Sequence, residues 1–249
     1  VTQHPELAIG VETGALDFVT GHDPRHREVA VAIDPESGDE YSAFYKIPRD
    51  TADLLARSRL IELGTEIGGT IPSLIKEIGS DALFALLRVL GGEELERARA
   101  FYARCRDEDL AVSVAQTDVK GDRSKGPSAQ ADRDLYLRVV DRNKDGIVVR
   151  GAKAHTSGSP NANWLITLPT RAMGPDDSEF ALSFAVPVNT EGVSLYVSAY
   201  SGGEKNAFEF PLSHRTRMLE TLTVFEDVFV PWEQVFLCGN SALAGPLAL

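Results

Sequence analysis

The stretch from Leu110 to Lys125 reads LAVSVAQTDVKGDRSK, and it divides the chain into two parts of different character. Its first half is a short apolar run rich in β-branched residues, which is typical of a buried strand. Its second half is a loop of charged and hydroxyl side chains. Apolar residues recur at helical spacing before this stretch, whereas short strand-like runs separated by turn residues follow it. The sequence therefore predicts an α+β protein.

Residues 1–109 are predicted to form a mainly helical domain. Asp50 is a suitable N-cap for a first helix, which is expected to end at Gly68. A third helix is supported by the acidic residues in its own first turn. A glycine within a helical pattern, followed by Ser80 and Asp81, is expected to interrupt the second. The expected helices run from Asp50 to Gly68, from near Pro72 to Leu90 with a break at 79–81, and from Glu93 to Arg106.

Residues 110–238 are predicted to form an antiparallel β domain. Asn143-Lys144-Asp145-Gly146 between two of the runs indicates a tight hairpin, because glycine accepts the positive φ that such a turn requires. Residues 239–249 are small and apolar, and we expect them to begin a further helical domain that is cut short. The expected strands are 110–115, 135–140, 146–150, 164–168, 180–186, 193–198 and two between 222 and 236, separated near Pro231.

Composition excludes several classes of protein. The 249 residues carry 25 Lys and Arg against 37 Asp and Glu, a formal net charge of −12, which disfavours nucleic-acid binding. The apolar runs are far shorter than the roughly 20 residues of a membrane-spanning helix, so no membrane is expected. With only two cysteines, a reduced cytoplasmic setting is expected. Rossmann, P-loop and nucleophile-elbow motifs are absent from the sequence.

Two segments at strand ends carry the residues most suited to chemistry. The first, 117–125, gathers three cations, two carboxylates and two hydroxyls around a glycine, a set that can bind an anion or a polar ring edge. The second, 152–159, places His155 in a turn rich in glycine and hydroxyl groups, where it can shuttle protons or donate a hydrogen bond. From the residues alone, a solvated loop of mutually neutralised charges and a backbone-bonded turn histidine remain alternatives.

Three ordered motifs give the chain a resemblance to a known family. They are VAQTDVKGDRSKGPS at 114–128, DGIVVRGAKAHTSG at 145–158 and VFEDVFVPWE at 224–233. Together they resemble the flavoprotein family of 4-hydroxyphenylacetate 3-hydroxylase and 4-hydroxybutyryl-CoA dehydratase, from about Thr51 to Cys238. The resemblance implies an acyl-CoA-dehydrogenase-like architecture, with a helical domain, an antiparallel β-barrel or sandwich domain and a C-terminal helical bundle that is absent here. It also implies FAD as cofactor, and a homotetramer of chains about twice this length.

The resemblance assigns roles to both strand-end segments. Arg123 and His155 are the implied catalytic residues: Lys120 and Arg123 would stabilise the reduced flavin, and His155 or Thr156 would donate hydrogen bonds near its N5 or O4 atoms. The implied cofactor-binding residues are Ala115, Gln116, Thr117, Lys120, Gly121, Asp122, Arg123, His155 and Thr156.

Two departures from the family patterns bear on the reaction. The cluster-bearing dehydratases carry a cysteine pair where this chain has Ser73 and Glu77, and an iron–sulfur cluster needs such thiolates. The phenol hydroxylases carry Arg, Tyr and His where this chain has Ile78, Ala82 and Val114. The expected activity is hydroxylation of an aromatic, 4-hydroxyphenylacetate-like substrate by O₂ and FADH₂ from a separate reductase. A cluster-free dehydratase or isomerase acting on a CoA thioester is the alternative, and a non-catalytic scaffold fragment is a third.

Overall fold

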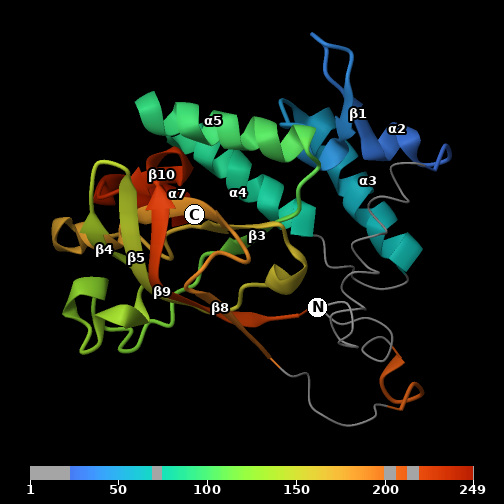
Figure 1. Ribbon diagram of the computed structural model, residues 1–249. Coiled ribbons are helices and arrows are strands. Elements are labelled where there is room, and N and C mark those ends of the chain that lie inside the picture. Colours follow the sequence, from blue (N-terminus) through green and yellow to red (C-terminus); the bar gives the residue numbers. More distant parts are fainter. Residues whose placement is uncertain (1–22, 69–74, 199–205, 212–218, 249) are drawn as a thin grey trace.

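The computed structural model describes residues 23–68, 75–198, 206–211 and 219–248 as a helical part joined to a β part (Figure 1). The helices are α2 (Arg27–Ala30), α3 (Thr51–Gly68), α4 (Ile75–Val89), α5 (Gly92–Asp107) and α7 (Ala244–Ala248). The strands are β1 (Val31–Ile33), β2 (Glu40–Ser42), β3 (Val112–Ala115), β4 (Arg138–Arg142), β5 (Gly146–Lys153), β6 (Trp164–Thr167), β7 (Leu182–Pro187), β8 (Val193–Val197), β9 (Thr221–Pro231) and β10 (Val235–Cys238). Short 3-10 helices are η1 (Ala43–Tyr45), η2 (Pro127–Ala129), η3 (Arg133–Leu135), η4 (Ser159–Asn161), η5 (Pro175–Phe180), η6 (Trp232–Gln234) and η7 (Ser241–Leu243).

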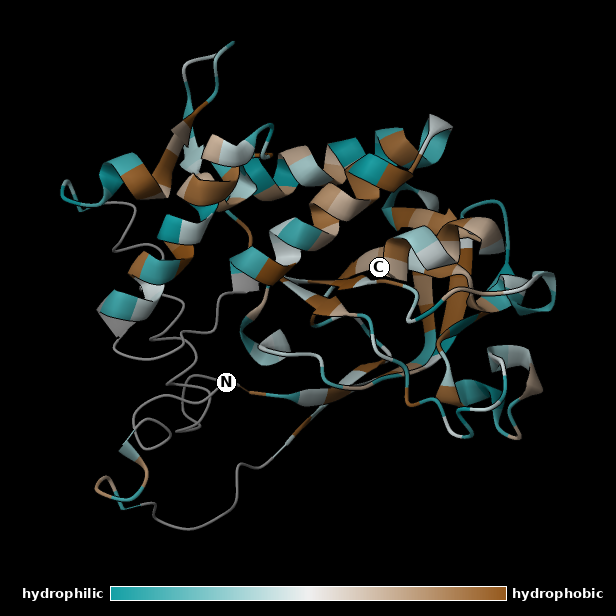
Figure 2. Cartoon of the chain, turned by 180° about the vertical axis from the view of Figure 1, so that it is seen from behind, coloured by the Kyte–Doolittle hydropathy of each residue, from teal (hydrophilic) through white to brown (hydrophobic). Residues whose placement is uncertain are grey.

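Helices α4 and α5 cover one face of the sheet formed by β10, β7, β6 and β3. Leu83 and Leu86 of α4 and Phe101 of α5 are buried in one cluster with Trp164 and Phe236 of the strands beneath them. The Phe101 ring lies 5.2 Å from the Trp164 ring, centroid to centroid, in an edge-on arrangement. Figure 2 shows the apolar side of these helices turned toward the apolar strands. This packing fixes the helical part on the β part.

Helix α4 is continuous through Gly79, so the predicted break at 79–81 is wrong. A Cβ atom at Gly79 would overlap the carbonyl oxygen of Val112, which shows that the helix lies directly against β3 at this point. The glycine therefore serves a close approach of two backbones rather than a helix end. In contrast, the predicted N-cap is confirmed, because the Asp50 carboxylate accepts a hydrogen bond from the Asp53 N–H at 2.9 Å.

The β part consists of two four-stranded sheets, in the orders β10-β7-β6-β3 and β4-β5-β9-β8. Strands β3 and β6 pair in parallel, from Val112 opposite Trp164 to Ala115 opposite Thr167, so the prediction of a wholly antiparallel domain is wrong for this pair. Between them the chain crosses to the second sheet and returns, and such a crossover allows two strands to run in the same direction. The other strand pairs are antiparallel, and the α+β class is confirmed.

The inner faces of the two sheets enclose a second core. Leu165 and Phe184 of the first sheet are buried against Val149 and Phe225 of the second, and the two phenylalanine rings meet edge to face at 5.7 Å. Along β5 the buried side chains alternate as a sheet with one inward face requires. In the described residues neither sheet closes on itself, so the β part is two packed sheets and not a closed barrel.

A small hairpin of β1 and β2 beside α2 was not expected from the sequence. Its strands have three residues each, which is too short to show an alternating pattern. Its turn is held by the Asp34 carboxylate, which accepts hydrogen bonds from the N–H groups of Glu36 and Ser37. The Pro-Glu-Ser-Gly run after Asp34 is the one signal that indicates this turn.

None of the helices in the described residues is both long enough and apolar enough to cross a lipid bilayer. The predicted 143–146 hairpin is present, because the Asn143 N–H donates to the Gly146 carbonyl at 2.9 Å. The last described helix, α7, lies within the segment in which a further helical domain was predicted to begin. The division into domains at 109/110 and 238/239 remains a prediction.

We predict that Gly79→Ala destabilises the protein by roughly 1–3 kcal/mol, because the added methyl group must displace the backbone of β3. Urea unfolding measures the change in the free energy of unfolding. Gly91→Ala is the control, since its new Cβ atom meets nothing within 4 Å and its φ is −141°. Equal unfolding midpoints for the two variants would show that the contact of α4 with β3 is not tight.

Candidate functional site

Two predicted strand-end segments meet at one edge of the first sheet. Because β3 and β6 run in parallel, the chain leaves both strands at the same edge. The end of β5 reaches this place from the other sheet: Asp118 forms an isolated bridge with Lys153, and the Ala154 N–H donates to the Thr117 carbonyl at 2.7 Å. The structure thus brings the segments 115–123 and 155–156 together, although they are distant in sequence.

A buried ion pair joins these segments. Lys153 Nζ lies 2.8 Å from the Asp118 carboxylate, and the two side chains are only 4% and 2% exposed. The ammonium also donates to the carbonyl oxygens of Gln116 and Leu168, at 3.0 and 2.9 Å. The carboxylate in turn accepts from the Leu137 N–H at 3.1 Å. One pair of charges therefore holds four stretches of backbone.

Burial acts on both members of the pair. It raises the pKa of Asp118, against the opposing charge of Lys153, and it lowers the pKa of Lys153, against the charge of Asp118. Both residues lie in the two candidate segments, but neither was among the predicted catalytic or cofactor-binding residues. A lysine on the inward-facing pattern of β5 was the available signal, because lysine is almost never fully buried without a partner.

The first three residues predicted to contact the cofactor lie at the exit of β3. Ala115 is fully buried, whereas Gln116 and Thr117 are half-buried. The Gln116 side-chain amide donates to the Ala248 carbonyl at 3.3 Å, which places the end of α7 beside the loop. Of these three residues, only Gln116 and Thr117 therefore have side chains accessible to a ligand where the chain leaves β3.

The next part of the loop is a tightly built turn. Lys120 and Gly121 both have positive φ, 80° and 54°, and a Cβ atom at Gly121 would overlap the side chains of Leu135 and Gln130. Gln130 accepts from the Asp122 N–H at 3.0 Å and donates to the Asp122 carbonyl at 2.8 Å. Because this glutamine is buried, it fixes the backbone that carries Lys120 to Arg123.

Asp122 and Arg123 are exposed at the end of that turn. The Asp122 carboxylate accepts from the Ser124 hydroxyl at 2.7 Å and from the Ser124 N–H at 3.0 Å, and these hydrogen bonds lower its pKa. Arg123 lines a hollow of about 230 Å³ together with Lys120, Tyr136, Thr170 and Arg171. Tyr136, Thr170 and Arg171 were not predicted as site residues. Tyr136 follows η3 and the other two follow β6, so they lie outside the two candidate segments.

His155 and Thr156 differ in accessibility. His155 is exposed and has φ 55°, a left-handed conformation that histidine adopts more readily than most residues. Thr156 is 0% exposed, and its hydroxyl accepts a hydrogen bond from the Thr223 hydroxyl at 3.0 Å. Its N–H donates to the Thr221 carbonyl. The imidazole is therefore available to a ligand, while the Thr156 side chain serves the contact with β9.

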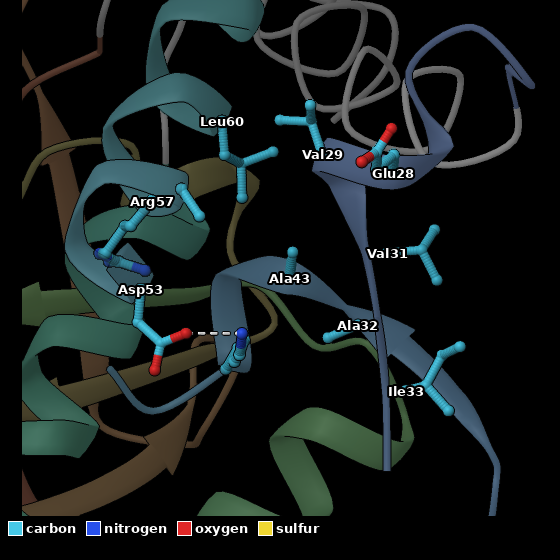
Figure 3. A pocket seen from close by; sticks show the side chains of 11 residues that line it. Glu28, Val29, Val31, Ala32, Ile33, Ala43, Asp53, Arg57 and Leu60 are labelled. Atoms are coloured by element: carbon cyan, nitrogen blue, oxygen red, sulfur yellow. Dashed lines mark ion pairs between the residues drawn. The ribbon is translucent and has the colours of Figure 1, made fainter. Parts of the chain in front are cut away.

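A second hollow, of about 310 Å³, lies in the helical part between α2, β1 and α3 (Figure 3). Val29 and Leu60 supply part of its apolar wall. Lys46 and Asp53 face one another at its edge with their charged atoms 2.6 Å apart. Arg57 is held by the Phe44 carbonyl at 3.0 Å. No predicted site residue lines this hollow, and its two facing charges neutralise each other.

Comparisons with known proteins bear on the whole chain. Residues 1–237 match the family described as 4-hydroxyphenylacetate 3-hydroxylase N terminal. The chain is 32% identical over 246 residues to the 4-hydroxyphenylacetate 3-monooxygenase oxygenase component of Thermus thermophilus, which covers 97% of this chain and 50% of that protein.

Solved structures agree with the match in sequence. An oxygen-tolerant archaeal 4-hydroxybutyryl-CoA dehydratase from N. maritimus superposes with a TM-score of 0.87 at 28% identity, over 99% of this chain and 50% of that one. The oxygenase component of 4-hydroxyphenylacetate 3-monooxygenase, solved in complex with FAD, superposes with a TM-score of 0.83 at 32% identity, over 99% and 51%. The chain thus spans about half the length of the relatives that it matches.

We predict that Lys153→Met lowers the free energy of unfolding by about 3–5 kcal/mol, because it leaves the Asp118 carboxylate buried without its partner. Adding Asp118→Leu removes that stranded carboxylate, so the double variant is expected to be more stable than Lys153→Met alone. Urea unfolding of the single and double variants measures both effects.

The control for this cycle is Arg150→Met, on the same strand. Arg150 pairs with Asp227 at the surface, where the side chains are 43% and 54% exposed, and we expect its unfolding midpoint to change little. A double variant that is less stable than Lys153→Met would contradict the assignment of the pair as a coupled anchor.

Proposed function

The chain belongs to the 4-hydroxyphenylacetate 3-hydroxylase family, and from this premise we propose that it carries the flavin-facing part of a two-component aromatic monooxygenase. The observation that carries the proposal is the junction of segments 115–123 and 155–156, where the exposed His155 and a cationic loop face outward from a rigid backbone. The likeness to an oxygenase component solved with FAD supports FAD as the cofactor. Bound reduced flavin supplies the capacity to activate O₂ for hydroxylation.

The residues of the junction fit a flavin in several respects. An exposed imidazole N–H at His155 can donate to a polar edge of the ring, and its left-handed backbone lies in the turn that follows β5. Gln116 and Thr117 offer polar groups at the neighbouring exit. Thr156 acts by holding the turn, since its hydroxyl is committed to β9. The buried Asp118–Lys153 pair keeps these exits in register.

The substrate pocket is proposed to be less polar than in the phenol hydroxylases. Ile78 and Ala82 lie on α4, and Val114 lies on β3, against which α4 packs at Gly79. Ile78 is 42% exposed, so an apolar group is presented at this surface. A substrate recognised here would be an aromatic ring held by apolar contact more than by a phenolate partner.

A dehydratase or isomerase acting on a CoA thioester is the second candidate. The structural likeness to a 4-hydroxybutyryl-CoA dehydratase and the Lys-Gly-Asp-Arg and Lys-Ala-His segments favour it. Of the two positions where that branch carries cysteines, Glu77 lies in α4 and Ser73 lies outside the described residues. Because neither residue is a cysteine, this candidate is an enzyme without an iron–sulfur cluster. A non-catalytic scaffold is the third reading, and it predicts no binding of FAD.

The proposal extends to the protein's partners and setting. A separate flavin reductase would supply the reduced cofactor, as the term "oxygenase component" in the relatives' names supports. We propose a cytoplasmic homotetramer for the protein at its natural length. FAD is expected to bind only weakly to residues 1–249 alone, because these residues correspond to about half of the relatives.

We predict that the natural-length protein, mixed anaerobically with reduced FAD and then with oxygenated buffer, gives a transient absorbance change before the oxidised flavin spectrum appears. The change should require both the protein and O₂, because a site that excludes water slows the loss of activated oxygen as hydrogen peroxide. Stopped-flow spectroscopy measures it. Binding of FAD without such a transient, accompanied by exchange of substrate α-protons with solvent, would favour the CoA-thioester candidate.

We also predict that His155→Asn weakens FAD binding about three- to tenfold, the range expected for loss of one hydrogen bond. Asparagine tolerates the positive φ at this position, so the fold should persist. Fluorescence titration of FAD measures the affinity. His26→Asn, the same exchange at the N-cap of α2, is the control. Unchanged affinity in His155→Asn would remove this residue from the flavin site.

A further inference from the structure

The hollow beside the junction is lined by cations from two loops. Lys120 and Arg123 come from the loop after β3, and Arg171 comes from the loop after β6. The parallel pairing of β3 and β6 sends both loops to the same edge, so residues about 50 positions apart share one cavity. Tyr136 and Thr170 complete its wall. The hollow is therefore a direct product of the sheet topology.

Neighbouring carboxylates balance the positive charge of this hollow only in part. Asp118 is paired with Lys153, and Asp122 is bound by Ser124 and lies 3.5 Å from Lys125 Nζ. Asp177 accepts hydrogen bonds from the Ser128 hydroxyl and N–H, which lower the pKa of its carboxyl against the effect of burial, and the charge of Arg171 adds to this shift, so Asp177 offsets part of the Arg171 charge. Across the described part of the chain, none of the three cations Lys120, Arg123 and Arg171 forms an ion pair. This concentration of unpaired charge contrasts with the protein's net charge of −12.

The hollow is also built in advance of any ligand. The Lys120 N–H donates to the Leu135 carbonyl at 3.4 Å, and Arg171 Nη1 donates to the Lys125 carbonyl at 3.3 Å. Tyr136 is 1% exposed, and its ring packs against Phe180 in an edge-on arrangement at 6.2 Å. A ligand would thus meet groups whose backbone is already ordered, which reduces the entropy lost on binding.

We propose that this hollow binds a phosphate or diphosphate group of a nucleotide-bearing ligand. Guanidinium groups match phosphate oxygens in a two-pronged geometry, and an ammonium adds a point charge. The volume of about 230 Å³ is below the roughly 300–1,000 Å³ of pockets that enclose a whole drug-sized ligand, so it suits a charged head group. The flavin ring, with at most one delocalised negative charge, does not require three cations.

The assignment changes the role of two predicted residues. Lys120 and Arg123 then hold a phosphate group rather than the flavin ring, and Arg171 joins them. Two sources offer this chemistry: the diphosphate of FAD and the phosphates of a CoA thioester. The choice between these sources depends on the proposed function, whereas the affinity of the hollow for phosphate does not.

The first test is calorimetric titration of the natural-length protein with inorganic pyrophosphate. We expect one site per chain, with affinity reduced about tenfold in Arg171→Gln and again in the Arg123→Gln/Arg171→Gln double variant. The affinity should also fall as salt rises, since ionic contacts are screened. Arg99→Gln is the control, because Arg99 is 59% exposed on α5 beside Glu96. Thermal unfolding of each variant checks that the fold is intact.

Further titrations distinguish the two sources. If FAD supplies the phosphate, Arg171→Gln weakens FAD about tenfold and leaves riboflavin, which has no phosphate, unchanged. If a CoA thioester supplies it, the same variant weakens CoA about tenfold and leaves FAD unchanged. Either result supports the phosphate site, and the second also favours the CoA-thioester candidate.

The proposal is overturned if pyrophosphate does not bind at millimolar concentration, or if Arg171→Gln and Arg99→Gln bind it equally. These outcomes are separable from the test of the proposed function. A protein that binds pyrophosphate but gives no oxygen-dependent flavin transient keeps the phosphate site and loses the monooxygenase assignment. A protein that gives the oxygen-dependent flavin transient but does not bind pyrophosphate loses the phosphate site and keeps the monooxygenase assignment.

Discussion

The buried contact of Lys153 with Asp118 is the constraint on which the arrangement of the site depends. Removing two charges from water costs several kcal/mol per ion by rough estimate, and only excellent geometry offsets that cost. Here the ammonium meets one carboxylate and two carbonyl oxygens, and the carboxylate also meets a backbone N–H. The pair thereby connects the exits of β3, β5 and β6 with the approach to β4. An apolar pair would fill the same space but could not specify these polar partners.

The outline of the fold was predictable from local patterns. Short runs rich in β-branched and aromatic residues located β5 to β9, and Asp50 located the start of α3, because strand propensity and N-capping act within a few residues. The continuity of α4 at Gly79 and the parallel pairing of β3 with β6 were not predictable. Both depend on which elements become neighbours in space: Gly79 and Val112 are 33 positions apart, and Val112 and Trp164 are 52 positions apart.

The site was predictable in the same limited sense. A charged loop directly after a strand and a histidine in a glycine-rich turn pointed to 115–123 and 155–156, and these segments do meet. Their common anchor was not predicted: the inward-facing position of Lys153 indicates a buried lysine, but nothing in the sequence pairs it with an aspartate 35 positions away. Nor could Arg171 be added to the cationic loop before the direction of β6 was known. Burial of Thr156 likewise follows from its packing on β9.

Two of the hydrogen bonds made by Lys153 end on main-chain oxygens, and this has an evolutionary consequence. Every amino acid offers a carbonyl, so the side chains at 116 and 168 can change during divergence without loosening the anchor. The loops that leave this edge of the sheet can therefore acquire new ligand specificities while the backbone at their base keeps its position. Such an arrangement suits a family whose members act on chemically different substrates.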